Sequence, residues 1–134
     1  MALLTSLKHQ RQAYQMLEHP LCRAMSATPA PELARLSKQL VMDIRTLSID
    51  NYAEFLNLMR LFQTNKVSVF DVLPKLANLL RDEPKVLWTL TYFVPEHAQS
   101  FWYMLLLDRC NLAELKSAIQ ASLSIHGLDE TYPL

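Results

Sequence analysis

The chain has 134 residues, 51% of them hydrophobic, and its 13 basic and 13 acidic side chains leave no formal net charge. This length fits one domain, and the apolar content is ample for a core, so a disordered chain is not expected. A neutral chain is also not expected to bind nucleic acid by neutralising phosphates. The single glycine, Gly127, excludes Gly-rich phosphate loops, dinucleotide fingerprints and nucleophile elbows, and it disfavours hairpin-rich β folds.

The two cysteines are typical of an intracellular protein. Cys22 and Cys110 are far apart and have no metal-binding neighbours, so we expect reduced thiols and no metal site. No apolar run approaches the roughly 20 residues of a membrane helix. The sequence does not distinguish a nuclear from a cytoplasmic location. Mitochondrial import is a further alternative, because no acidic residue precedes Glu18, as in many transit peptides. Residues 1–47 are basic and the remainder is acidic, which either orients a partner or reflects two solvated faces.

The first helix is expected over residues 2–17, whose larger apolar side chains lie roughly on one side. These side chains are Leu3, Leu7, Tyr14 and Leu17. They form too much apolar surface for a free tail, so we expect the helix to dock on the rest of the chain. His19 should end it, because a residue before proline avoids helical geometry. Residues 20–31 contain three prolines and are interpreted as a linker.

Two amphipathic helices are expected next, over residues 32–47 and 52–63. The first has the apolar stripe Leu33, Leu36, Leu40, Ile44 and Leu47. Ser48 or Asp50 is placed to cap the second helix. The second helix is apolar over more than half its circumference, so it must be covered on two sides. Its main apolar face consists of Tyr52, Phe55, Leu56, Met59 and Phe62.

A helix over residues 69–81 follows, and Ser68 and Asp71 form a capping box at its start. Pro74 lies inside this range and should cause a kink or a late start. An acidic pair before Pro84 then begins a short buried helix over residues 86–94.

The last two helices are expected after Pro95 and after Asn111. The first of them, over residues 95–107, has an aromatic core face. Asn111 is a good cap for the second, and Gly127 stands where a C-cap glycine is expected. Residues 128–134 are interpreted as a short tail. Across the whole chain, the strongest candidates for burial are Leu56, Leu76, Leu90, Phe93 and Phe101.

Part of this pattern resembles a known family. The run Tyr52-x-x-Phe55-Leu56, with Leu58, Met59 and Phe62 after it, resembles the second helix of paired amphipathic helix domains. Residues 90–95 resemble the Phe-Leu-Pro end of those domains. The harmonin homology domain, a five-helix relative, is the closer match. Its last helix begins with proline and a nearby histidine, as at Pro95 and His97, and an acidic-Pro step precedes its fourth helix, as at residues 83–84.

The resemblance implies an all-α fold: a five-helix harmonin-homology-like bundle over residues 32–107 with one extra helix at each end. The flanking segments 1–31 and 108–134, and Pro74 within the third helix, depart from the family pattern. Members act in adaptor and scaffold proteins and bind amphipathic helical segments of their partners. The family groove lies between the first two helices, which match residues 32–47 and 51–63 here.

We expect six apolar residues to include those that line this groove: Leu36, Leu40, Ile44, Phe55, Leu56 and Met59. Their spacing puts the first three on one helix face and the last three on the facing one. Methionine suits a surface that must adapt to a partner. Two alternatives stay open: these residues pack on each other as core, or the first helix occupies the groove in cis and makes the protein autoinhibited.

Catalytic patterns are missing from the sequence. His97 follows Glu96 directly, and adjacent helical residues do not face each other. The aromatic residues lack interleaved Lys and Arg, which favours packing over stacking on nucleic acid bases. We therefore expect a non-enzyme that has no cofactor. The alternatives are a structural subunit of a constitutive homo- or hetero-oligomer, which its mass in solution would reveal, and an enzyme whose site is not visible in sequence.

Overall fold

The structure is a computed structural model that describes residues 11–128. All regular structure within that range is helical, so the all-α class is confirmed. Residues 11–18 are helical, and the elements after them are α2 (Pro20–Ser26), α3 (Ala30–Leu47), α4 (Ile49–Gln63), α5 (Val69–Leu79), α6 (Pro84–Leu90), η1 (Thr91–Phe93), η2 (Glu96–Ala98), α7 (Gln99–Arg109) and α8 (Leu112–Ile125). The harmonin-homology-like arrangement of five of them stays a prediction.

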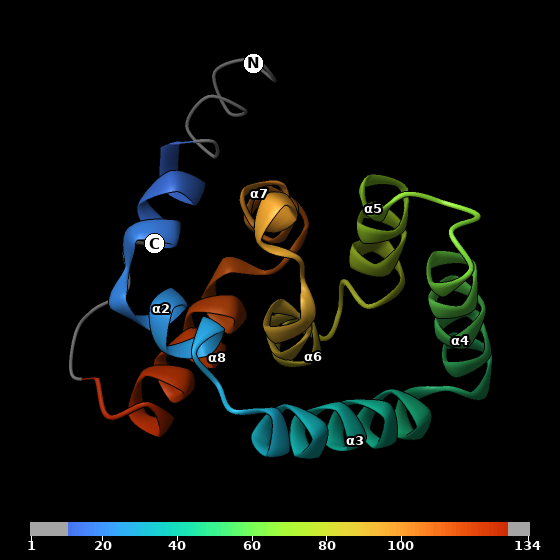
Figure 1. Cartoon of the computed structure of the whole chain (residues 1–134), viewed down its shortest axis with the longest axis horizontal. Helices are drawn as coiled ribbons and strands as arrows, with labels where there is room; N and C mark the ends of the chain where they lie inside the picture. Colours follow the sequence, from blue (N-terminus) through green and yellow to red (C-terminus); the bar gives the residue numbers. More distant parts are fainter. Residues whose placement is uncertain (1–10, 129–134) are drawn as a thin grey trace.

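The helices are arranged around a centre formed by α6, α7 and α8 (Figure 1). In that view α3 runs along the bottom, α4 rises from its end, and α5 stands between α4 and the centre. Helix α3 packs on α4 and α6, α5 packs on α4 and α7, and α6 packs on α8. One hydrophobic core runs through all of them, from Ala13 to Leu123, so the flanking segments share the core of residues 32–107.

The helix starts follow the expected caps, with one correction. The Ser48 Oγ accepts a hydrogen bond from the Asn51 amide (3.3 Å), and the Asn111 Oδ1 accepts from the amides of residues 113 and 114. Ser68 is the residue before α5, but its hydroxyl bonds the Asp71 carboxylate (3.2 Å) and caps no amide. The expected capping box therefore forms only as a contact between its two side chains.

Two helices end in the same left-handed turn. After α8, Gly127 has a φ of 70°, and the amides of Gly127 and Leu128 donate to the carbonyls of Ser124 and Leu123. This is the Schellman pattern expected of a C-cap glycine. After α4, Asn65 takes the same role with a φ of 58°, and the next amide bonds back to the Leu61 carbonyl. Asparagine is the residue that best tolerates this conformation after glycine.

The expected linker over residues 20–31 is wrong, because α2 occupies its first part. Pro20 begins the helix, where its missing amide costs nothing. The His19 Nδ1 accepts a hydrogen bond from the Leu21 amide (3.0 Å) and caps the helix. Leu21, Cys22 and Met25 are buried. The proline that ends the first helix therefore also starts another.

The docking of the first helix is confirmed in part. Leu3 and Leu7 lie outside the described residues. Within the described part Ala13 and Met16 are fully buried, whereas Tyr14 is 54% exposed. The buried face of this helix is therefore rotated about the helix axis from the face predicted to contain Tyr14. The Cys22 Sγ of α2 lies 2.9 Å from the Tyr103 hydroxyl of α7. Figure 1 shows residues 11–18 and α2 on the side away from α4, so this described part does not lie in the predicted α3–α4 groove.

The predicted core is right in some positions and wrong in others. Leu76 and Leu90 are buried, and Phe101 is half-buried. Leu56 and Phe93 are 45% and 39% exposed, so their predicted burial is wrong. Pro74 does not delay α5, which begins at Val69.

Candidate interaction surfaces

The six residues predicted to line one groove lie in different places. Leu40, Ile44 and Phe55 are core residues that are at most 4% exposed, and the helices that carry them pack on each other. For these three the alternative of ordinary core packing describes the structure.

The other three predicted residues remain accessible but do not meet. Leu36 is half-buried and faces α6 and α8. Met59 is half-buried and faces α5 and residues 93–95. Leu56 lies on the exposed surface of α4, one turn before Met59. Leu36 and Met59 therefore line two separate hollows of the structure, where the sequence predicts a single groove.

The first hollow, here called the apolar pocket, lies between α4, α5 and the segment after α6. Its volume is about 70 Å³. All of its lining residues are apolar: Met59, Phe62, Val69, Val72, Leu73, Leu76, Leu90, Phe93, Val94, Pro95 and Trp102. Small-molecule sites usually have roughly 300–1,000 Å³. A pocket this small has room for no more than about one apolar side chain.

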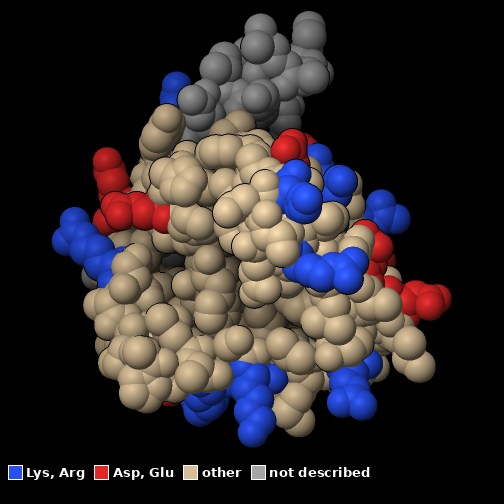
Figure 2. Space-filling model, turned by 45° about the vertical axis from the view of Figure 1, so that its right-hand side comes forward, with Lys and Arg blue, Asp and Glu red and all other residues tan. Residues whose placement is uncertain are grey.

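Three elements that contribute to the apolar pocket each also carry a large apolar side chain exposed to solvent, and of these three side chains only Phe93 belongs to the lining itself. The three are Leu56 on α4, Phe70 on α5 and Phe93 on η1, between 39% and 46% exposed. Phe70 also lies edge-on to Phe101 of α7, with ring centroids 5.5 Å apart. Figure 2 shows the molecule with the α4 and α5 side turned forward. The middle of this face is hollowed and largely free of charged side chains, which lie mostly towards its margin.

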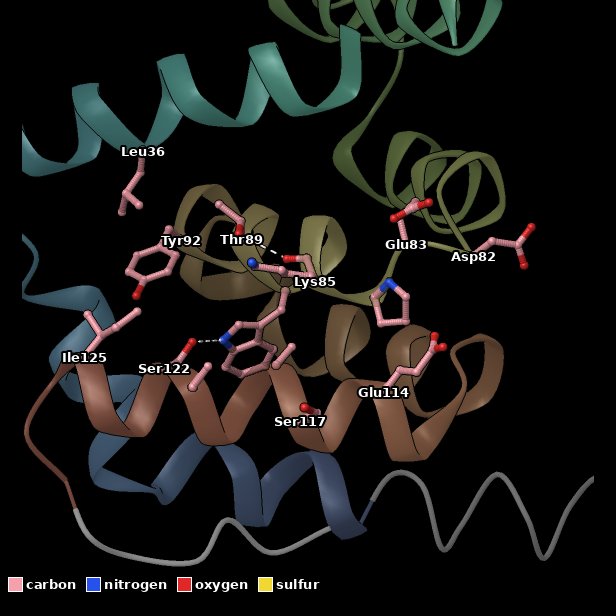
Figure 3. Close-up of a pocket in the computed structure, with 14 residues that line it drawn as sticks. Leu36, Asp82, Glu83, Lys85, Thr89, Tyr92, Glu114, Ser117, Ser122 and Ile125 are labelled. Carbon is pink, nitrogen blue, oxygen red and sulfur yellow. Dashed lines mark hydrogen bonds between the residues drawn. The ribbon is translucent and has the colours of Figure 1, made fainter. Parts of the chain in front are cut away.

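The second hollow, here called the α6–α8 groove, has a volume of about 470 Å³ and a different chemistry (Figure 3). Asp82, Glu83 and Glu114 stand at one end, and Leu36, Tyr92 and Ile125 at the other. Between them α8 contributes only small side chains to the lining: Ser117, Ala118, Ala121 and Ser122. The groove is therefore amphipathic along its length, acidic at one end and apolar at the other.

Hydrogen bonds fix the aromatic side chains of the α6–α8 groove. The Trp88 Nε1 donates to the Ser122 Oγ (2.6 Å) on the groove floor. The Tyr92 hydroxyl lies 2.7 Å from the His126 Nε2, and the two rings stack. Burial, and next the charge of Glu32, raise the pKa of Tyr92, so its hydroxyl is neutral at physiological pH. These bonds hold α8 against α6 and give the groove rigid walls.

Two observations bear on nucleophilic and metal chemistry within the described residues. Burial raises the pKa of the Cys110 thiol to about 11, so it stays protonated at neutral pH and is a poor nucleophile. From residue 11 to residue 128, no three His, Cys, Asp or Glu side chains are close enough together to hold a metal ion. Among the helices of that range, none has both the length and the hydropathy to cross a membrane.

Sequence reasoning missed Phe93 as an exposed residue and missed the α6–α8 groove altogether. A weak signal for Phe93 was present, because Val94 and Pro95 follow it and indicate that the helix ends there. The groove has no such signal. It depends on how α6 and α8 approach each other, and side-chain spacing within one helix does not specify that approach.

Comparisons with known proteins do not assign the chain: no protein-family model matches it, and no curated protein or solved structure does either. The resemblance to the harmonin homology domain therefore stays a prediction that rests on the sequence pattern of residues 32–107.

Proposed function

We propose that this chain is a non-enzymatic interaction module that binds an amphipathic helix of a partner protein. One apolar side chain of that helix enters the apolar pocket, and its neighbours lie against Leu56, Phe70 and Phe93. Helix-in-groove recognition uses apolar anchors spaced three or four residues apart. The resemblance to harmonin homology domains belongs to this proposal, with the binding surface moved from between α3 and α4 to the far side of α4.

The observation that carries the proposal is a wholly apolar pocket whose lining includes the exposed Phe93, on elements that also carry the exposed Leu56 and Phe70. Exposed apolar side chains that stand singly need no explanation, but several on the elements that form one pocket are typical of an interaction site. Binding energy at such sites concentrates in a few central anchors surrounded by weaker contacts. The half-buried Met59 at the edge can adjust its shape to the anchor that enters.

The test is a selection of displayed helical peptides on the immobilised full chain. Enriched peptides should share large apolar residues at helical spacing. Phe93→Glu and Leu56→Glu should each weaken their binding at least about tenfold, a difference that is readily measured. Both residues are exposed, so the variants should fold. Leu112→Glu is the matched control, because Leu112 is 51% exposed and lines neither hollow.

Two results would contradict the proposal. One is a set of enriched peptides that bind the Phe93→Glu variant as tightly as the wild-type chain. The other is a wild-type chain that sediments as a stable oligomer and becomes monomeric in Phe93→Glu. The second result would show that copies of the chain cover the pocket, and the protein would then be a structural subunit.

A further inference from the structure

The α6–α8 groove is a second candidate surface, distinct from the apolar pocket in position and chemistry. Its lining residues recur at helical spacing on both walls. Lys85, Thr89 and Tyr92 follow each other along α6 and η1, and Glu114, Ala121 and Ile125 along α8. Two neighbouring helices with parallel rows of side chains leave a furrow into which the ridge of a third helix can pack.

The middle of the groove favours close approach of a backbone. On α8 the middle positions are occupied by Ser117, Ala118, Ala121 and Ser122, and Ser117 and Ala121 are exposed. Helix axes approach more closely where the side chains at the contact are small. The groove is therefore suited to a helix and is less suited to an extended peptide, which would leave its own backbone groups unpaired there.

The charges of the groove define the occupant. Three carboxylates, on Asp82, Glu83 and Glu114, stand against the one ammonium of Lys85, so this end is acidic (Figure 3). At the other end Ile125 is 77% exposed beside Leu36 and Tyr92. On α3, near that end, Glu32 and Arg35 form an ion pair and largely cancel each other. Carboxylates repel phosphates, which argues against nucleic acid and anionic membranes.

We propose that the α6–α8 groove binds a helical segment of a second partner, one with Lys or Arg at one end and a large apolar residue at the other. Along α8, Glu114 and Ile125 are separated by about 16 Å at 1.5 Å per residue, or about three helical turns. The basic and apolar residues of the partner helix should have the same separation. The protein is then a bivalent adaptor that holds two helices on different faces.

The test uses a fluorescent, alanine-based peptide of about 16 residues, long enough to span the groove as a helix. It carries two lysines in one end turn and an isoleucine and a leucine three turns away. Its twin has glutamates in place of the lysines. Anisotropy titrations of the full chain should show the lysine peptide binding at least about tenfold more tightly than its twin, a preference that shrinks as salt is added.

Variants then locate the peptide. Ala121→Phe fills the groove from an exposed position and should weaken binding at least about tenfold, whereas Gln120→Phe, exposed on α8 outside the groove lining, should not. Asp82→Lys should remove the preference for the lysine peptide, and Glu54→Lys is the control of equal charge change. Circular dichroism melts verify that each variant folds.

Equal affinity for both peptides, or tight binding that survives Ala121→Phe, would overturn the assignment of this groove. Loss of binding in Phe93→Glu with no effect of Ala121→Phe would place the peptide in the apolar pocket, which refutes this inference and leaves the proposed function standing. Failure of the displayed-peptide test at Phe93 would leave the groove unaffected, so the two proposals fail separately.

Discussion

The two halves of the molecule are held together by different forces. In the half built from α6, α7 and α8, side chains bond across helices: Trp88 to Ser122, Tyr92 to His126, and Trp102 to Thr91. In the arm formed by α3 and α4, the side-chain hydrogen bonds described by the structure stay within one helix, as between Gln39 and Asp43. Helix α6 buries five of its seven residues, whereas α3 buries two of 18.

This contrast separates α6, α7 and α8, here called the framework, from the arm of α3 and α4, whose helices are expected to shift more readily. Directional hydrogen bonds between buried groups tolerate little movement, because a broken one leaves a polar atom without water. Apolar contacts alone are not directional, so helices held by them can shift with a smaller penalty. Met59 and Phe62, on the arm, form one side of the apolar pocket, whose lining also includes Leu90 and Trp102 of the framework, while the α6–α8 groove lies mainly in the framework. One side of the apolar pocket is therefore expected to move more readily than the walls of the groove.

The largest expected effect is the loss of a framework aromatic. Trp102 is fully buried and its Nε1 donates to the Thr91 Oγ1 (2.9 Å). Trp102→Ala should lower the free energy of unfolding by about 3–5 kcal/mol, measured by urea denaturation. Phe93→Ala removes another aromatic ring from a position that is 39% exposed and should cost clearly less. Equal losses would remove the distinction between framework and surface.

A smaller effect is expected from the hydrogen bond between α6 and α8. Ser122→Ala leaves the buried Trp88 Nε1 without the acceptor that it has now. An unpaired buried donor costs about 1–3 kcal/mol. Ser124→Ala, on the exposed side of the same helix, is the control. Urea denaturation that shows no difference between the two variants would mean that the bond contributes nothing net.

The corner between α3 and α4 should show the next effect. Ser48→Ala removes the cap of α4 and should cost about 1 kcal/mol. Because the arm lacks cross-helix bonds, hydrogen exchange should quicken in α4 before it does in α7. Ser68→Ala is the comparison: Ser68 precedes α5 but caps no amide, so its substitution should lower the free energy of unfolding less than Ser48→Ala does. A uniform increase in exchange over both halves would show that the arm and the framework open together.

The smallest effect is expected at the most exposed apolar residue. Ile49 is 83% exposed at the first position of α4. Ile49→Ser should change the free energy of unfolding by no more than about 0.5 kcal/mol. A clear destabilisation in the same denaturation experiment would indicate a contact that holds the arm in place.

The sequence predicts the parts of this fold that depend on neighbours along the chain. The caps at Ser48 and Asn111 and the glycine after α8 follow local rules, and all three are present. Helix α2 was missed because Pro20 was taken only as the end of the preceding helix and not as the start of another. Leu56 and Phe93 were placed in the core because spacing identifies an apolar face but not what covers it. Both candidate surfaces depend on how separate helices approach each other, and the periodicity within one helix contains no information about that approach.

Ser48 is the single non-helical residue between α3 and α4, and its backbone is extended, with φ −168° and ψ 138°. Helix α4 has 15 residues and is about 22 Å long. Its direction relative to α3 depends on the backbone torsion angles of Ser48 alone. A rotation of α4 by about 10° about Ser48 would move the far end of the helix by about 4 Å over this length. Met59 and Phe62 lie near that end. The width of the apolar pocket is therefore set in part by the torsion angles of a residue that does not line it.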